Sequence, residues 1–242
     1  MTEEDVLEAN RYFYEKPGSW VELGIQADNL KNEFFLVTGS NKFFQNVLRE
    51  FEASCVIIEI NDAGDAYRIV WGLCEGGKPT SELPTHLMNH AIRFERTDGA
   101  ERVIYHAHCP ELISLTTIVP ADPKRLSKIL WQCMTECVIV FPDGVGVVPW
   151  MIPGGAEIAQ ATCELMQKHS CVIWCQHGIF CSGNTFDEAF GLMHVIEKSA
   201  KIYNIARSAN GGKEPEFVIA DKDLAEVAQA YGCHANEEFL DL

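Results

Sequence analysis

The sequence predicts an α/β protein with a mixed or largely antiparallel central sheet covered by helices. Runs of β-branched and aromatic residues alternate along the 242 residues with segments whose apolar residues recur at helical spacing. Residues 55–60 and 66–71 form two such runs around Asn61-Asp62-Ala63-Gly64-Asp65, a polar loop typical of a β-hairpin. Hairpins give antiparallel pairs, and helical segments bury their apolar faces against a sheet. This combination favours one layered α/β fold.

The remaining strands are expected where short runs of β-branched, aromatic or other apolar residues are bounded by turn residues. These runs cover residues 34–37, 102–105, 137–141, 146–150 and 171–175. Pro142-Asp143-Gly144 separates two of them, and the run at 34–37 leads into the polar turn 38–42. The first thirty residues lack such runs and are predicted to be irregular.

Helices are predicted where apolar residues recur every three or four positions. The clearest start is Pro79-Thr80-Ser81-Glu82, in which Ser81 has the side chain of an N-cap residue. The apolar residues that follow at helical spacing are Leu83, Leu87, Ala91 and Ile92. The longest helix is predicted over about residues 185–208. Others are expected from residue 110 and over about 125–135, 156–168 and 224–231.

Length and composition favour one domain over residues 1–242. The chain is 47% hydrophobic, which is enough for a large core, and it contains no linker-like stretch or repeat. No apolar run approaches the ~20 residues of a membrane span. The acidic start Met1–Asp5 lacks the layout of a signal peptide. A cytoplasmic protein is therefore expected.

The net charge of −16 restricts the partners. Nucleic acids and anionic membranes bind basic surfaces, so neither is expected as a partner. A small anionic substrate is compatible with this charge, because a metal ion and backbone N–H groups can offset a distant negative field. Any phosphate site must then be built locally.

The ten cysteines do not suggest a disulfide scaffold or a zinc knuckle. No Cys-x-x-Cys motif occurs, and several cysteines lie in or beside apolar runs, where free cysteine behaves as a small apolar side chain. Cys171 and Cys175 bracket one predicted strand, roughly 13 Å apart at ~3.3 Å per residue, too far for one disulfide or one metal ion. The cysteines are expected to be buried thiols in a reducing compartment.

Three histidines form the strongest metal-binding pattern. His106 and His108 end a predicted strand, and side chains at positions i and i+2 of a strand share a face, roughly 6.6 Å apart along the backbone. His177 follows another apolar run and precedes Gly178, which allows close approach of the backbone. Three imidazoles would leave one position open for substrate, as in catalytic zinc sites; the alternative is a set of hydrogen-bonded core histidines. The other histidines are interpreted as structural: His86, His90, His169, His194 and His234.

Two carboxylates accompany this pattern. Glu82 is predicted in the first turn of a helix, where a negative charge is favourable by itself. That explanation leaves out the neighbouring Thr80 and Ser81 hydroxyls, which a phosphate site would use. Glu136 is predicted to end a helix just before a strand, where a negative charge is mildly unfavourable. This position favours a chemical role for Glu136.

Ordered motifs extend these observations. They are Thr38-Gly39-Ser40-x-Lys42-Phe43-Phe44, Pro79-Thr80-Ser81-Glu82-Leu83-Pro84, His106-x-His108, Phe141-Pro142-Asp143-Gly144-Val145-Gly146, Gln176-His177-Gly178-Ile179-Phe180 and Glu197-Lys198-Ser199-Ala200-Lys201. In this order the set resembles the class II, zinc-dependent sugar-phosphate aldolases, and within them the branch that acts on rhamnulose phosphate. The resemblance covers the chain from about Thr2 to the C-terminus and implies the class II aldolase fold.

The resemblance implies retro-aldol cleavage of L-rhamnulose 1-phosphate to dihydroxyacetone phosphate and L-lactaldehyde, with one zinc ion per subunit of a homotetramer. It assigns zinc binding to His106, His108 and His177, and proton exchange at the reacting carbon to Glu82. It assigns proton transfer at the aldehyde oxygen to Glu136, acting across a subunit interface. The implied phosphate contacts, made through hydroxyls and backbone N–H groups, are Ser40, Asn41, Thr80 and Ser81.

The chain departs from the family pattern at two places. Asn41 stands where glycine is common, and asparagine tolerates the left-handed backbone that the turn needs. The family's N-terminal helix and Gly-Gly-Asn turn are expected to be lacking. Rival activities on the same fold are those of fuculose-1-phosphate aldolase and ribulose-phosphate 4-epimerase, and a non-catalytic adducin-like binding module is a third alternative. The three histidines and Glu82 argue against the module.

Overall fold

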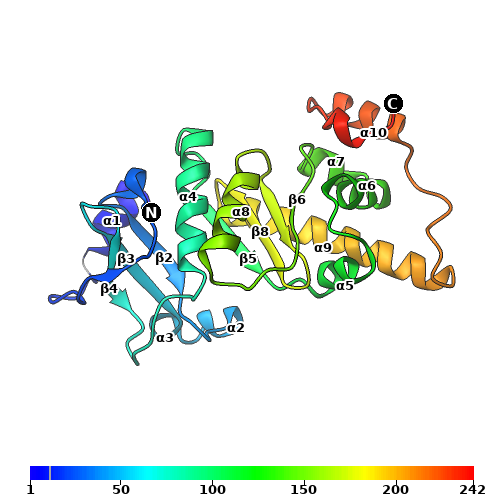
Figure 1. The fold of residues 1–242 in the computed structure, drawn as a ribbon. Helices are drawn as coiled ribbons and strands as arrows, with labels where there is room; N and C mark the ends of the chain where they lie inside the picture. Colours follow the sequence, from blue (N-terminus) through cyan, green and yellow to red (C-terminus); the bar gives the residue numbers. More distant parts are fainter. Residues whose placement is uncertain (11) are drawn as a thin grey trace. The chain divides into compact units, whose positions relative to one another are not determined.

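The computed structural model describes residues 1–10 and 12–242, and it divides into two compact units. Unit 1 consists of Met1–Ala91 and Pro153–Ala159, and unit 2 of Ile92–Ile152 and Gln160–Leu242. Each unit has its own four-stranded sheet and its own buried core among the described residues (Figure 1). The α/β class is confirmed, with the strands in two sheets where one central sheet was expected. The single domain expected over residues 1–242 stays a prediction.

The sheet of unit 1 is antiparallel throughout, in the order β1-β4-β3-β2. Its strands are β1 (Val21–Glu22), β2 (Phe34–Thr38), β3 (Cys55–Ile60) and β4 (Ala66–Gly72). The predicted hairpin is confirmed as β3 and β4, and Asn61 Oδ1 closes its loop by accepting hydrogen bonds from the backbone N–H groups of Gly64, Asp65 and Ala66. Alternate residues of β3 form the core with Leu83 and Leu87 of helix α4 (Leu83–Thr97).

The start of unit 1 is helical, so the prediction of an irregular first thirty residues is wrong there. Helix α1 covers Glu3–Ala9, and the short elements η1 (Asp28–Leu30), α2 (Phe44–Val47) and α3 (Phe51–Ser54) follow. Thr2 and Asp5 form a capping box: the Asp5 N–H donates to Thr2 Oγ1, and the Thr2 N–H donates to the Asp5 carboxylate. A threonine three residues before an acidic side chain is a local pattern that marks a helix start.

The sheet of unit 2 has the order β5-β8-β7-β6. Its strands are β5 (Val103–Ala107), β6 (Gly146–Val148), β7 (Cys171–Trp174) and β8 (Gly178–Gly183). Only β6 and β7 run parallel; β8 pairs antiparallel with both β7 and β5. β8 was not predicted, because glycine begins and ends it and a cysteine and a serine interrupt its apolar run. It is nevertheless buried along its whole length, between two partner strands.

Helices pack around this sheet and around the long helix α9 (Phe186–Ala209). Figure 1 shows α5 (Pro110–Ile118), α6 (Pro123–Cys133) and α7 (Glu136–Val140) gathered along α9. The remaining elements are α8 (Ala156–Met166), α10 (Asp221–Ala230) and η2 (Glu237–Phe239). Helices α5, α6, α8, α9 and α10 lie close to the predicted ranges, whereas α7 and η2 were not predicted. Thr185 caps α9 by accepting from the Glu188 N–H, and Leu192, Ile196 and Tyr203 of α9 enter the core of unit 2.

Residues 137–141 form most of helix α7 and its C-cap, so the strand predicted there is wrong. The Phe141 N–H donates to the Cys137 carbonyl, the i to i−4 bond of an α-helix. Cys137 and Val138 are buried whereas Val140 is 42% exposed, which is the one-sided burial of a helix. Core packing here overrides the β propensity of the Val-Ile-Val run. Glu136 therefore lies in the first turn of α7, where a negative charge is favourable, and the positional reason for singling it out does not hold.

The ten cysteines are free thiols, and seven of them are buried. Burial raises the pKa of Cys109, Cys137 and Cys163 to about 12, so these groups stay protonated and act as apolar side chains. In the part of the chain that the structure describes, no helix combines the length and the apolar character that a membrane span requires.

Candidate metal centre

The three histidines of the predicted metal pattern come together in unit 2. His106 lies on β5, His108 follows the end of that strand, and His177 precedes β8. Their ring centroids lie 5.1 Å apart for His106 and His108, 5.3 Å for His106 and His177, and 4.7 Å for His108 and His177. The pairing of Ala107 with Ile179 brings the start of β8 to the end of β5. Strand register thus joins residues far apart in the sequence.

The donor atoms of this cluster converge. The Nε2 atoms of His108 and His177 lie 3.0 Å apart, and the nearest ligand nitrogens of the three rings are all within 4.8 Å of one another. Tetrahedral zinc with Zn–N bonds of ~2.0–2.1 Å separates its ligand nitrogens by roughly 3.3 Å. Two nitrogen lone pairs that face each other at 3.0 Å would repel, and a cation or a proton between them removes this repulsion. The donor set therefore fits a metal ion.

His106 is held in one tautomer by the neighbouring strand. Its Nδ1 lies 3.0 Å from the Ile179 carbonyl oxygen, which can only accept, so Nδ1 carries the proton and Nε2 keeps its lone pair. The ring stacks on Phe180 at 4.2 Å between centroids and an angle of 22°. A second partner that fixes the tautomer and the ring plane is typical of a metal-binding histidine.

His177 is presented by a tight turn between β7 and β8. The His177 N–H donates to the Trp174 carbonyl at 3.0 Å, and Gln176 has the left-handed φ of 57°. Gln176 is tied to α5: its N–H donates to Thr116 Oγ1 at 3.0 Å and its side-chain amide donates to the Thr116 carbonyl at 2.5 Å. Gln176 was part of a sequence motif without a predicted role, and Thr116 was not predicted at all, because the contact joins positions 60 apart in the chain.

Gly178 allows the backbones to meet beside His108. A Cβ atom on Gly178 would lie 2.3 Å from the Ala107 carbonyl oxygen and 3.3 Å from the His108 Cα. Contacts under 3.0 Å force a shift, and both partners here are backbone. The close approach expected at this glycine is confirmed.

Glu197 of α9 binds the start of helix α5, close in sequence to His108. Its two carboxylate oxygens accept hydrogen bonds from the backbone N–H groups of Glu111 and Leu112, at 3.0 and 2.9 Å. These groups belong to the first turn of α5, which begins two residues after His108. A carboxylate at a helix N-terminus satisfies amides that have no partner within the helix. This gives the Glu197 motif a structural role.

The predicted phosphate-binding residues form a separate feature in unit 1. Gly39 and Pro79 pair in an antiparallel bridge, the Ser40 N–H donates to the Lys78 carbonyl, and the Thr80 N–H donates to the Thr38 carbonyl. The two segments that carry Ser40, Asn41, Thr80 and Ser81 are therefore neighbours. Asn41 has a φ of 58°, as expected for the residue that replaces glycine.

Glu82 directly precedes α4, which begins at Leu83, two residues after the serine expected to cap it. The Glu82 N–H donates to Thr80 Oγ1 at 3.3 Å, and the Leu83 N–H donates to the Thr80 carbonyl at 3.1 Å. Thr80 thus fixes the backbone that carries Glu82. One turn further along, burial lowers the pKa of His86 to about 4, with the Glu82 charge opposing the shift, so the imidazole is neutral near pH 7.

The remaining predicted residues lie outside the histidine cluster. Glu136 is exposed at the start of α7 and is not part of it. His90 packs on Phe35 with 5.0 Å between ring centroids, and buried His169 stacks on Phe239 at 6.4 Å. These ring contacts agree with the structural interpretation of the two histidines.

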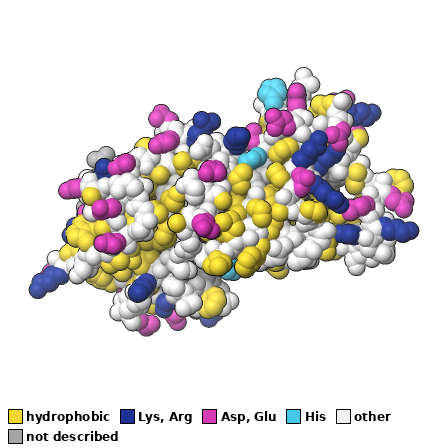
Figure 2. Space-filling model, viewed as in Figure 1, with side chains coloured by type: hydrophobic (Ala, Val, Ile, Leu, Met, Phe, Trp, Pro, Cys, Tyr) yellow, Lys and Arg dark blue, Asp and Glu magenta, His cyan; other side chains and the backbone are white. Residues whose placement is uncertain are grey.

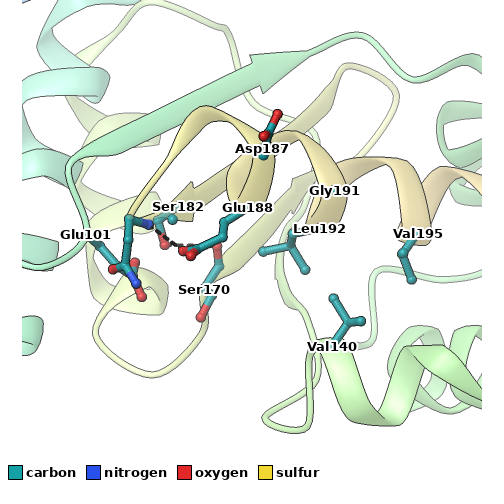
Figure 3. A pocket seen from close by; sticks show the side chains of 11 residues that line it. Glu101, Val140, Ser170, Ser182, Asp187, Glu188, Gly191, Leu192 and Val195 are labelled. Atoms are coloured by element: carbon teal, nitrogen blue, oxygen red, sulfur yellow. Dashed lines mark hydrogen bonds between the residues drawn. The ribbon is translucent and has the colours of Figure 1, made fainter.

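A hollow of about 420 Å³ in unit 2 lies at the other end of β8 (Figure 3). Gly183 borders it, five residues from Gly178 on a strand that rises ~3.3 Å per residue. Acidic side chains from three positions line it: Glu101, Asp187 and Glu188. The Glu188 carboxylate accepts a hydrogen bond from the Asn184 N–H at 2.8 Å. The three histidines are not among the residues that line this hollow.

Comparison with known proteins gives the family. The family described as Class II Aldolase and Adducin N-terminal domain matches residues 4–204. The chain belongs to this family. It is 44% identical to a protein named Rhamnulose-1-phosphate aldolase from Mannheimia succiniciproducens, over 93% of this chain and 83% of that protein. It is 42% identical to a protein of the same name from Enterobacter sp. strain 638, over 98% of this chain and 85% of that protein.

Solved structures agree with this family. A sugar-phosphate aldolase from Thermotoga maritima superposes with a TM-score of 0.68 at 27% identity, covering 84% of this chain and 86% of that one. An L-fuculose 1-phosphate aldolase superposes with a TM-score of 0.57 at 21% identity, covering 94% of this chain and 91% of that one. The second likeness shows the fold alone.

The contact at Gly178 predicts that Gly178→Ala destabilises unit 2, by about 1–3 kcal/mol, because the added methyl group displaces β8 from β5. Urea unfolding followed by circular dichroism measures the change. Gly191→Ala is the matched control, since no atom lies within 4 Å of a Cβ built there and α9 gains helix propensity of about 0.5–1 kcal/mol. A Gly178→Ala protein as stable as the wild type would contradict the close approach.

Proposed function

We propose that the chain is a zinc-dependent enzyme that cleaves L-rhamnulose 1-phosphate to dihydroxyacetone phosphate and L-lactaldehyde by a retro-aldol reaction. The convergence of three imidazoles at one end of the unit 2 sheet carries the proposal. Membership of the family and 44% identity to a protein named Rhamnulose-1-phosphate aldolase support the choice of substrate.

His106, His108 and His177 are the proposed zinc ligands. The Ile179 carbonyl holds the His106 Nδ1 proton, which leaves Nε2 as the ligand atom. Three protein ligands leave coordination positions for the substrate. Zinc, when bound, acts as a Lewis acid on the carbonyl group of the ketose, which helps the carbon–carbon bond to break.

Two carboxylates are proposed to move the protons. In cleavage the hydroxyl oxygen that becomes the aldehyde oxygen loses its proton, and the electron pair of the broken bond remains on the ketone fragment. Glu136 assists the first proton transfer, and Glu82 returns a proton to the reacting carbon of the ketone fragment.

The segments around Ser40 and Thr80 are proposed to bind the substrate phosphate. The two segments are neighbours through the Gly39–Pro79 bridge, and they offer hydroxyl and amide donors without adding charge. Such donors suit an anion in a chain of net charge −16, because they act at short range. The residues of this proposed phosphate site are Ser40, Asn41, Thr80 and Ser81.

A cytoplasmic homotetramer is proposed, in which Glu136 serves the metal centre of a neighbouring subunit. Glu136 is exposed at the start of α7. A residue that serves a neighbouring subunit has to be exposed in the single chain. Hydrophobic side chains also reach the surface, as the yellow areas of Figure 2 illustrate. In unit 2 the exposed large apolar side chains include Trp150, Phe186 and Ile205, which are 64%, 65% and 58% exposed. Apolar surface of this kind is typical of subunit contacts. Ten free thiols fit a reducing compartment.

Turnover of matched ketose phosphates tests the proposed reaction. Zinc-loaded protein is expected to cleave L-rhamnulose 1-phosphate in preference to L-fuculose 1-phosphate, with dihydroxyacetone phosphate detected by a coupled reduction. Chelation of the metal should abolish cleavage and zinc should restore it. Preference for fuculose 1-phosphate, or epimerisation of ribulose 5-phosphate, would assign a rival activity, and absence of both metal and turnover would favour a binding module.

Substitutions separate metal binding from proton transfer. His106→Ala is expected to lose the zinc, because two imidazoles remain of three. Glu82→Gln is expected to keep the zinc and to lose turnover by about 10²–10⁴-fold, the usual contribution of a general acid–base group. Elemental analysis and steady-state kinetics on the same samples measure both. A Glu82→Gln enzyme with wild-type turnover would exclude the proton-transfer role.

Mixing variants extends the same test to Glu136. Glu136→Gln alone should keep zinc and lose turnover, while refolding it together with Glu82→Gln should recover part of the activity. Recovery is expected because some sites in mixed tetramers then pair an intact Glu82 with an intact Glu136 from a neighbour. No recovery from correctly assembled mixtures would mean that both carboxylates act within one chain.

Loss of a phosphate contact should appear mainly in KM. Ser81→Ala is expected to raise KM for L-rhamnulose 1-phosphate by about 10-fold, the loss of one hydrogen bond to a charged group. Cleavage of unphosphorylated L-rhamnulose by the same variant serves as the control and should be unchanged. An equal loss with both substrates would place Ser81 outside the phosphate site.

A further inference from the structure

The turn that carries His177 is held in a conformation that it would not adopt by itself. Gln176 has a φ of 57°, in the left-handed region that side chains other than glycine seldom occupy. Such a residue persists only where its surroundings fix it. His177 follows directly, so a change in the backbone of Gln176 would move the backbone that carries this imidazole.

Thr116 of α5 supplies the contacts that fix this turn. It is 4% exposed and uses both of its polar groups: Oγ1 accepts from the Gln176 N–H at 3.0 Å, and the carbonyl accepts from the Gln176 side-chain amide at 2.5 Å. The same hydroxyl donates its proton to the Ile113 carbonyl at 2.8 Å, which leaves its lone pairs directed at Gln176. The Thr116 carbonyl belongs to the last turn of α5, where carbonyls lack partners within the helix. Thr116 and Gln176 thus satisfy one another's hydrogen-bonding groups.

The other end of α5 is anchored beside His108. Glu197 of α9 binds the N–H groups of Glu111 and Leu112, and Asn204 of α9 donates to both the carbonyl and the carboxylate of Glu111. α9 itself is fixed by its buried face in the core of unit 2. One short helix therefore joins the strand end that carries His108 to the turn that carries His177.

We propose that Thr116 is a positioning residue for the metal centre: through Gln176 it holds His177 in place, with Nε2 toward His108, before a metal ion binds. The inference rests on the proposed function for its metal, but it is carried by contacts within unit 2. Preorganisation of this kind raises metal affinity, because no binding free energy is lost in ordering the histidine when the metal binds. Partners that orient metal ligands typically contribute 10- to 100-fold in affinity.

Zinc affinity of the apo protein tests the proposal, measured by competition with a chromophoric chelator. Thr116→Val removes the hydroxyl with little change in volume and should weaken zinc binding by about 10- to 100-fold. Thr116→Ser keeps the hydroxyl and should stay within a few-fold of the wild type. Thr117→Val is the matched control: this exposed neighbour makes the same type of bond, from its hydroxyl to the Ser114 carbonyl, and its loss should leave affinity unchanged.

A second variant covers the case in which Thr116→Val does not fold. Gln176→Ala changes an exposed side chain and removes only the bond to the Thr116 carbonyl, so it should fold and bind zinc several-fold more weakly. Co²⁺ spectra provide a readout that general destabilisation does not alter: the visible absorption of the folded variants should change in shape relative to the wild type. Wild-type affinity and spectra in both Thr116→Val and Gln176→Ala would overturn the proposal.

The same measurements keep the two proposals apart. Wild-type protein that binds zinc tightly, and loses it in Thr116→Val, supports the positioning role even if it fails to cleave rhamnulose 1-phosphate. In that case the proposed substrate is wrong and the metal centre stands. Wild-type protein that binds neither Zn²⁺ nor Co²⁺ would overturn both.

Discussion

The pairing of β5 with β8 is the constraint on which the candidate metal centre depends. Antiparallel register places Ala107 opposite Ile179, and it thereby brings His177 to the end of the strand that carries His106 and His108. The same ladder orients the donor atom of His106, because the Ile179 carbonyl binds its Nδ1. Gly178 makes the register sterically allowed, since any side chain there would meet the Ala107 carbonyl. The pairing of these two strands therefore sets the distance between the candidate ligands and the tautomer of His106.

Sequence patterns identified the features that are local. The hairpin loop at Asn61, the shared face of His106 and His108, and the left-handed turn at Asn41 each depend on a few adjacent residues, and the structure contains all three. Convergence of His177 was predicted from its place between an apolar run and Gly178, and the resemblance to a family assigned it the same role. The capping box of α1 is local too, although no helix was predicted from it.

Other features depend on partners that a single sequence does not display. Residues 137–141 have strand propensity but become helical, because Cys137 and Val138 pack into a core made by distant elements. β8 has a weak strand pattern and is ordered by the two strands beside it. The bond between Thr116 and Gln176 spans 60 residues and involves side chains without an obvious chemical role. Tertiary context decides each of these cases.

The electrostatics of the site follow from how its imidazoles are held. His106 is oriented by a backbone carbonyl, and the turn of His177 by a threonine and a glutamine, so these supports are neutral. A carboxylate in those places would make the ligands more basic and would reduce the positive charge of a bound cation. The nearby carboxylate of Glu197 instead satisfies two amides at the start of α5. In a chain of net charge −16, neutral supports of this kind would preserve the local positive charge of a bound cation, which the proposed phosphorylated substrate and its carbanionic transition state would require.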